Sequence, residues 1–281
     1  MTQRHCFLTL TTAVLSVLSL QGSVVVVNRQ NATSLNWYWV NDQTNQLAAN
    51  TISYAQTPPN SAEGSIDMTM SSVDDKPWVF TNQYGGVSLS SLVFDSYETF
   101  SVSNSGSTTL LAPRLEIGIG LNATDTIFRG RLGYSPSLVN TVDASVWDTW
   151  NPETDTRGGW YFTKQTQQSD NSFKFTYNTN ESCVNNNTAI INTSTCTLSA
   201  ILARNTGLYV NSSVFLGVVG FRTGGTPGTI ESTYADMLTV GVTGQGSKTF
   251  DFQATPEPST WVLALGFTAA FLPRLRKSLR G

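Results

Sequence analysis

The chain has 281 residues, 40% of them hydrophobic and 12% charged, which suits one large folded domain and argues against global disorder. Positions 24 to 255 hold 18 acidic and 11 basic residues, so this body carries a charge near −7 and would repel nucleic acid. His5 is the single histidine. If the N-terminal segment is removed, no histidine remains for Ser-His-Asp or Cys-His catalysis or for a His-ligated zinc ion.

Residues 1–23 have the pattern of a secretory signal peptide. Arg4 supplies a positive charge, an apolar stretch covers 6–20, and small residues follow. This order is typical of a substrate of the Sec translocon. We expect cleavage near Ser23, with an uncleaved anchor helix as the alternative interpretation.

The body of the chain alternates apolar and polar residues with a period of two, which predicts β-strands separated by turns rich in Gly, Asn, Asp and Ser. In 113–121 (PRLEIGIGL) every second side chain is Leu or Ile. The segment 213–221 (SVFLGVVGF) is apolar on both faces, which indicates a central strand. Further strands are expected at 24–27, 37–40, 65–70, 78–81, 92–102, 127–134, 160–164, 172–177, 236–242 and 249–252.

This spacing of strands predicts an all-β fold in which two antiparallel sheets pack face to face. One segment departs from the pattern. Residues 197–207 (TLSAILARNTG) predict a short helix, because a threonine precedes apolar residues on one side of a helix and a glycine follows them. No repeat of 20–50 residues is evident, which argues against a propeller or a solenoid.

Glu116, on the predicted strand 113–121, raises the question of a glycoside hydrolase. Such an enzyme needs two carboxylates roughly 5–10 Å apart in a groove. Arg129 and Arg131 lie on the next predicted strand. A surface ion pair between Glu116 and these arginines is the simpler interpretation, and we expect no catalytic residues.

Three tryptophans gather with charged residues in 146–162 (VWDTWNPETDTRGGWYF). Exposed indole rings stack on sugar rings, so Trp147, Trp150 and Trp160 are candidate glycan contacts. The alternative is that they pack in the core. Because Trp147 and Trp150 are three residues apart, a regular strand would turn them to opposite faces.

The acidic residues of the same segment suggest a second type of site. Asp148, Glu153 and Asp155 lie near Asn151 in a loop-like stretch, and oxygen ligands of this kind suit Ca²⁺. The spacing matches no EF-hand. We expect no other cofactor.

Two cysteines, Cys183 and Cys196, flank a polar loop, while Cys6 falls in the N-terminal segment. In an exported protein such a pair is typical of a disulfide. Two free thiols are the alternative.

The end of the chain combines a Pro-Glu-Pro motif (Pro256, Glu257, Pro258), an apolar segment and a basic end. The prolines predict a rigid, extended break. The uncharged segment 261–272 would span about 18 Å as a helix, less than the roughly 20 residues of a full membrane span. The residues expected in the membrane are Trp261, Leu263, Leu265, Phe267, Phe271 and Leu272, and the cations expected to stay in the cytoplasm are Arg274, Arg276, Lys277 and Arg280.

This ending resembles the PEP-CTERM sorting signal of exported proteins in Gram-negative bacteria. The resemblance implies an exosortase-type membrane enzyme as a processing partner. It also implies transient anchoring in the inner membrane and a destination in the cell envelope or extracellular matrix, where extracellular polysaccharide and biofilm are the associated materials. An ordinary C-terminal helix that packs on the domain is the alternative.

Residues 110–252 also resemble a set of PEP-CTERM ectodomains, in the order of RLEIGIGL, DTIFRGRLGY, the Trp-rich segment and YADMLTVGV…KTFDF. This implies a β-sandwich of jelly-roll or lectin-like shape without known catalytic residues. The chain is thus expected to contain a signal peptide (1–23), an ectodomain (24–253) and a sorting signal (254–281, with its membrane segment near 259–273). We expect a non-catalytic structural or glycan-associated module, with a carbohydrate-active enzyme on a lectin-like sandwich as the alternative.

Overall fold

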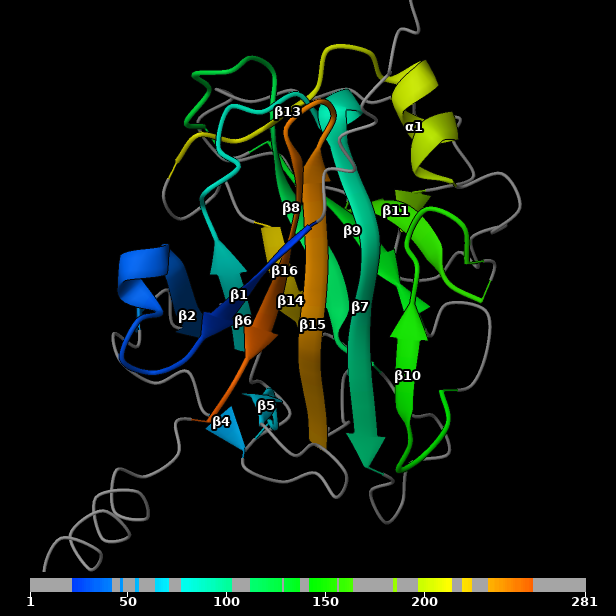
Figure 1. Ribbon diagram of the computed structural model, residues 1–281. Helices are drawn as coiled ribbons and strands as arrows, with labels where there is room; N and C mark the ends of the chain where they lie inside the picture. Colours follow the sequence, from blue (N-terminus) through cyan, green and yellow to red (C-terminus); the bar gives the residue numbers. More distant parts are fainter. Residues whose placement is uncertain are drawn as a thin grey trace, which may run out of the picture.

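The computed structural model is described for residues 22–41, 46–47, 54–55, 64–70, 77–102, 112–127, 129–136, 142–155, 157–163, 184–185, 197–213, 219–223 and 232–254. These residues form two β-sheets, largely antiparallel, and one α-helix (Figure 1). Within them, no helix is long and apolar enough to cross a membrane. The apolar stretch 6–20, the strand expected at 172–177, both loop cysteines and all residues after Ala254 lie outside the described part.

The first sheet contains β1 (Ser23–Val27), β4 (Tyr54–Ala55), β5 (Ser65–Asp67), β7 (Leu92–Val102), β10 (Trp147–Trp150), β15 (Ser232–Val242) and β16 (Gly246–Phe252). The second sheet contains β2 (Trp37–Asn41), β3 (Gln46–Leu47), β6 (Pro77–Thr81), β8 (Arg114–Gly120), β9 (Arg131–Ser135), β11 (Gly159–Thr163), β12 (Val184–Asn185), β13 (Tyr209–Val210) and β14 (Val219–Arg222). The helical segments are α1 (Leu198–Arg204) and two 3-10 turns, η1 (Thr33–Leu35) and η2 (Leu89–Ser91).

Several predicted elements are confirmed within these limits. Strand β7 has the bounds expected from its alternation. The last residues of the central strand predicted at 213–221 are confirmed as β14, which lies between β6 and β8, while Ser213 is not in a strand and 214–218 lie outside the described residues. Helix α1 begins where predicted, because the hydroxyl of Thr197 accepts a hydrogen bond from the amide of Ala200 at 3.2 Å. Gly207 follows the helix with a φ of 79°, a conformation that glycine adopts at little cost.

The hydrophobic core lies between the two sheets and is rich in aromatic rings. Trp37 of the second sheet meets Phe250 of the first, with ring centroids 5.1 Å apart. Tyr97 of β7 meets Phe221 of β14 at 5.5 Å, and Phe94 meets Trp160 at 5.7 Å. Burial of each such ring contributes about 1.5–3 kcal/mol, so these contacts hold the two layers together.

The edge strand β1 departs from the expected antiparallel arrangement, because it runs parallel to β16, with Ser23 opposite Lys248 and Val27 opposite Phe252. The chain therefore enters the first sheet at one end of this strand pair and leaves it at the other. The side-chain amide of Asn31 donates to the carbonyl of Val26 at 2.9 Å, which satisfies one backbone acceptor of the edge strand.

Candidate functional site

The three tryptophans of the Trp-rich segment do not form one surface. Trp150 and Trp160 are 2% and 1% exposed, and their indole N–H groups donate to Thr99 Oγ1 at 2.8 Å and to the carbonyl of Pro152 at 2.6 Å. The structure corrects the glycan-contact expectation for these two residues, because their rings fill the core and present no face to a sugar.

Trp147 has a different environment on the same strand. It pairs in register with Phe100, whereas Trp150 pairs with Tyr97. The three-residue spacing thus turns Trp147 to the outer face of the first sheet, where its ring lies 5.5 Å from that of Phe100 and is half-buried. Trp147 is the member of the trio that keeps some exposure.

Arg157 contacts two acidic residues, Asp148 in β10 and Asp155 in the loop after it. Its guanidinium donates to Asp155 at 2.7 Å and contacts Asp148 at 3.4 Å, and it lies 4.2 Å over the ring of Trp150. Burial alone would raise the pKa of Asp155, but the hydrogen bonds from Arg157 lower it. Two of the calcium candidates are therefore partners of an arginine.

The third calcium candidate, Glu153, binds elsewhere. Its Oε1 accepts the backbone N–H of Phe94 at 3.1 Å. Across the described ranges, no group of three His, Cys, Asp or Glu side chains could hold a metal ion. The structure therefore does not assemble Asp148, Glu153 and Asp155 into one calcium site.

Glu116 also differs from its expectation as half of a surface ion pair. It is fully buried on the outer face of the second sheet, where Arg222 donates a hydrogen bond to its Oε1 at 3.1 Å. Arg114 and Arg131 form longer ion pairs with its Oε1 at 3.8 Å and its Oε2 at 3.7 Å. Arg129 instead binds Asp125 at 2.7 Å. The expected pairing is thus corrected: Arg131 is one of three partners and Arg129 is none.

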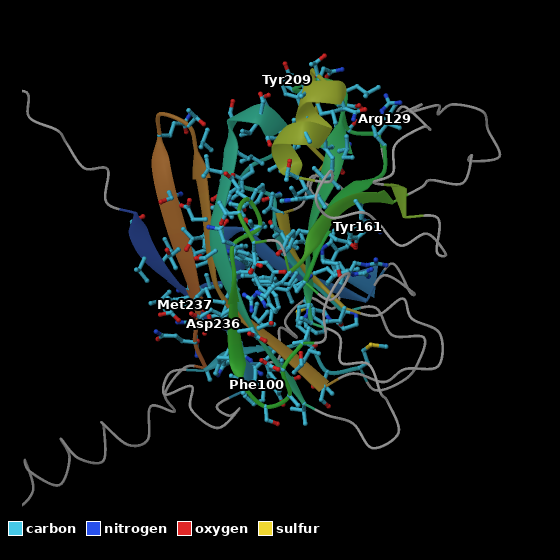
Figure 2. The ribbon with its side chains drawn as sticks, turned by 90° about the vertical axis from the view of Figure 1, so that its right-hand side faces the viewer. Phe100, Arg129, Tyr161, Tyr209, Asp236 and Met237 are labelled. Atoms are coloured by element: carbon cyan, nitrogen blue, oxygen red, sulfur yellow. The ribbon has the colours of Figure 1, made fainter. Side chains whose placement is uncertain are left out.

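Glycines beside Glu116 explain its burial. Gly133 and Gly220 are its register partners on β9 and β14. A Cβ atom at Gly133 would lie 2.6 Å from the ring of Tyr161, so this buried ring covers the glycine on the outer side of the second sheet (Figure 2). A Cβ atom at Gly220 would instead collide with the backbone carbonyl oxygen of Val79 on the neighbouring strand, so neither position accepts a larger residue without movement.

The charge state of Glu116 bears on the enzyme alternative. Burial alone would raise its pKa, but attraction to Arg222, Arg114 and Arg131 outweighs burial and lowers the pKa to about 2. A glycosidase general acid needs a raised pKa. Glu116 is therefore a structural ion and not a proton donor.

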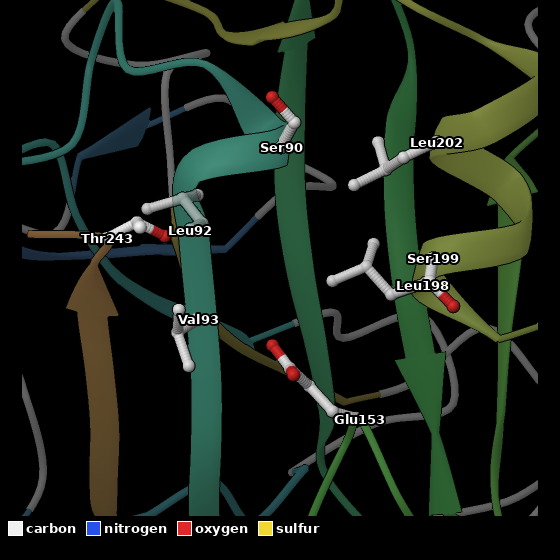
Figure 3. A pocket seen from close by; sticks show the side chains of 8 residues that line it. All are labelled: Ser90, Leu92, Val93, Glu153, Leu198, Ser199, Leu202 and Thr243. Atoms are coloured by element: carbon white, nitrogen blue, oxygen red, sulfur yellow. The ribbon is translucent and has the colours of Figure 1, made fainter.

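A cavity of about 390 Å³ lies beside α1, between this helix and the start of β7, near the turn that joins β15 to β16 (Figure 3). Its walls combine aliphatic side chains, hydroxyl groups and one carboxylate. The aliphatic residues are Leu92, Val93, Leu198 and Leu202, the hydroxyl residues are Ser90, Ser199 and Thr243, and the carboxylate is that of Glu153.

Hydrogen bonds fix the segments that form this cavity. The side chain of Asn151 accepts the amides of Glu153 and Thr154 at 3.0 and 2.9 Å, which shapes the loop that carries Glu153. The amide of Thr243 donates to the carbonyl of Ser91 at 2.8 Å. Figure 3 shows Leu198 and Leu202 pointing from α1 toward β7, with Glu153 extending between the two elements.

Sequence reasoning singled out Glu153 but missed the other seven lining residues. They come from segments that are far apart in the chain, and the pairing of β7 with β15 places Leu92 opposite Val242, next to Thr243. The one local signal was the helix beginning at Thr197, which places Leu198 and Leu202 on one side.

Comparison with known proteins found no match. No family model matches the sequence, and no curated protein or solved structure matches it either. The likeness of the tail to a sorting signal therefore depends on the residues of the tail alone.

Proposed function

We propose that this chain is an exported cell-envelope or extracellular-matrix protein whose folded part is a non-catalytic structural or glycan-associated module. The observation that carries the proposal is the tail, in which Pro256, Glu257 and Pro258 precede an apolar segment and four cations. The tail follows the last described strand, which ends at Phe252. An apolar segment followed by cations, placed after the last described strand, suits a membrane-sorting signal better than a part of the core.

The architecture supports a binding or structural role for the folded part. Two packed sheets with one helix are consistent with a β-sandwich of jelly-roll or lectin-like shape. The cavity beside α1 offers aliphatic and hydroxyl groups of the kind that bind sugars. Glu116, the carboxylate considered for catalysis, is buried among arginines.

The proposed route involves two partners. Residues 1–23 would direct the chain to the Sec translocon. The apolar segment 261–272 would then hold it in the inner membrane, with Arg274, Arg276, Lys277 and Arg280 on the cytoplasmic side, until an exosortase-type enzyme processes the tail. Extracellular polysaccharide is the proposed environment of the mature protein.

Fractionation of cells tests this route with three forms of the protein: the full chain, a chain that lacks 256–281, and a variant with alanine at Pro256, Glu257 and Pro258. We expect the full chain in the envelope or matrix, with mass spectrometry showing a mature C-terminus that has lost the tail. The truncated chain should lose membrane association, and the triple variant should stay in the inner membrane unprocessed. Recovery of all three forms in one fraction, with the full chain's tail intact, would contradict the proposal.

A further inference from the structure

The geometry points to a ligand class for the cavity beside α1: a sugar that carries a free amino group. This assignment rests on the proposed function as a glycan-associated module, and it names the chemistry that the module recognises. Each wall of the cavity matches one part of such a ligand.

The aliphatic walls match the apolar face of a sugar ring. Leu92 and Val93 of β7 lie on one side, and Leu198 and Leu202 of α1 lie on the other. Burial of C–H groups between them is favourable. The volume of about 390 Å³ is near the lower end of the range for small-ligand pockets, roughly 300–1,000 Å³.

The hydroxyl groups match the hydroxyls of a sugar. Ser90, Ser199 and Thr243 line the cavity from three different segments. Each hydroxyl already has one protein partner: Ser90 bonds to Ser88, Ser199 bonds to Thr197, and Thr243 donates to the carbonyl of Ser91. Because a hydroxyl oxygen has two acceptor sites, all three can still accept hydrogen bonds from the hydroxyls of a sugar ring.

The carboxylate selects a cation. Glu153 is the charged residue among the described residues that line the cavity. Its Oε1 accepts the amide of Phe94, and a carboxylate has about four acceptor sites, so it can also accept from a ligand ammonium group. Charge-assisted hydrogen bonds of this kind are about twice as strong as neutral ones. The body charge near −7 also attracts a cationic glycan and repels an acidic one.

The position of the cavity suits a protein that is held by its tail. Thr243 lies at the turn before β16, and the tail begins beyond Phe252, at the other end of that strand. A strand of seven residues separates these ends by roughly 20 Å. Figure 1 shows α1 and the turn between β15 and β16 at the end of the domain away from the C-terminal end of β16. The cavity that they line would thus face away from a membrane that holds the tail.

Calorimetric titration of the purified protein with glucosamine, N-acetylglucosamine, glucose and a glucosamine oligomer tests the assignment. We expect glucosamine to bind at least about tenfold more tightly than the two uncharged sugars. Tighter binding of the oligomer identifies a polysaccharide as the source of the amino sugar, and equal binding identifies the free monosaccharide.

Three variants locate the binding. Glu153→Gln keeps an acceptor for the Phe94 amide but removes the charge, so it should weaken glucosamine binding about tenfold. Asp95→Asn changes net charge equally at an exposed residue that does not line the cavity, and should bind like the parent. Ser199→Trp should fill the cavity and abolish binding of every probe, with thermal melts verifying that each variant is folded.

The assignment is overturned if no probe binds, if the three monosaccharides bind equally, or if Glu153→Gln binds glucosamine like the parent. These results are separable from the fractionation experiment. If sorting depends on the tail but no amino sugar binds, only the proposed ligand class is wrong. If an amino sugar binds but sorting does not depend on the tail, only the proposed destination is wrong.

Discussion

Glu116 and Asp236 are buried carboxylates on the outer faces of the two sheets, and they differ in what surrounds them. Three arginines surround Glu116 and lower its pKa to about 2. Burial raises the pKa of Asp236 to about 8 and outweighs the amides of Phe252 and Met237, which lower it, while Asp251 and Glu98 add smaller upward contributions. One carboxylate is therefore held as an ion and the other as a neutral acid at neutral pH.

This difference shows that burial by itself does not set the charge of a carboxylate. Desolvation disfavours the ionised form at both sites, and only nearby cations reverse its effect. Asp236 lies at an irregularity of β15, where the register with β7 shifts after Asp236 and Met237 has a φ of 50°. The amides freed at this irregularity bond to Asp236 Oδ1 at 2.7 and 2.9 Å.

Removal of the charge of Glu116 should have the largest effect on stability of the single substitutions at these faces. Glu116→Gln leaves three arginines around a neutral side chain, and loss of one partner from a buried ion cluster costs about 3–5 kcal/mol of unfolding free energy. Urea denaturation at pH 7 measures the loss. Glu98→Gln, a half-buried carboxylate of the first sheet, is the matched control and should change stability by less than about 1 kcal/mol. A similarly small change in stability for Glu116→Gln would show that the three arginines do not depend on the charge of Glu116.

Substitution of one tryptophan on each outer face tests whether the two sheets also differ in how deeply their outer side chains are buried. Trp78 is 3% exposed, with the guanidinium of Arg131 at 4.3 Å from its ring centre, so Trp78→Ala should cost about 3–4 kcal/mol. Trp147 on the first sheet is half-buried, and Trp147→Ala should cost about 1 kcal/mol. Equal losses of unfolding free energy for the two variants would show that the two outer faces do not differ in this way.

The pH dependence of stability sharpens the comparison, because the two carboxylates act with opposite sign. The pKa of Asp236 is raised in the folded state. Its contribution to the free energy of unfolding is therefore complete below about pH 4 and is lost as the pH rises to about 8. Asp236→Asn keeps an oxygen for the two amides and cannot ionise, so at pH 9 it should be more stable than the parent by on the order of 3 kcal/mol. The pKa of Glu116 is lowered in the folded state. Its contribution to the free energy of unfolding is therefore present above about pH 4.5 and is lost as the pH falls to about 2.

Urea denaturation of the parent and Asp236→Asn from pH 4 to pH 9 provides the measurement. The difference between them should widen toward alkaline pH and be smallest at pH 4. Parallel curves would mean that Asp236 ionises in the folded state without cost.

The smallest effect is expected at Arg157, whose side chain is 45% exposed. Its ion pairs with Asp148 and Asp155 are screened by water, so Arg157→Ala should lower stability by about 1 kcal/mol or less. Added salt should reduce this difference further. A loss near that of Glu116→Gln would show that exposure does not separate the two ion networks.

Much of the fold could be predicted because its strands are locally amphipathic. Strand β7 and the cap of α1 depend on neighbours in sequence, so alternation and one threonine were enough to place them. The parallel pairing of β1 with β16 was not predictable, since alternation gives no strand direction.

The candidate site was less accessible to prediction because its contacts are long-range. Arg222, the nearest partner of Glu116, is 106 residues away in the chain, and no local pattern links the two. The calcium hypothesis treated Asp148, Glu153 and Asp155 as one group, whereas Arg157 pairs with two of them and Phe94 binds the third.

The pairing of β1 with β16 also orders the events of folding. The first described strand joins its sheet only through the last, more than two hundred residues later. Because a chain is synthesised from its N-terminus, β1 must therefore stay without this partner until β16 has been made. Contacts of such long sequence separation form slowly, and the valine-rich strand needs protection from other open strands during that interval.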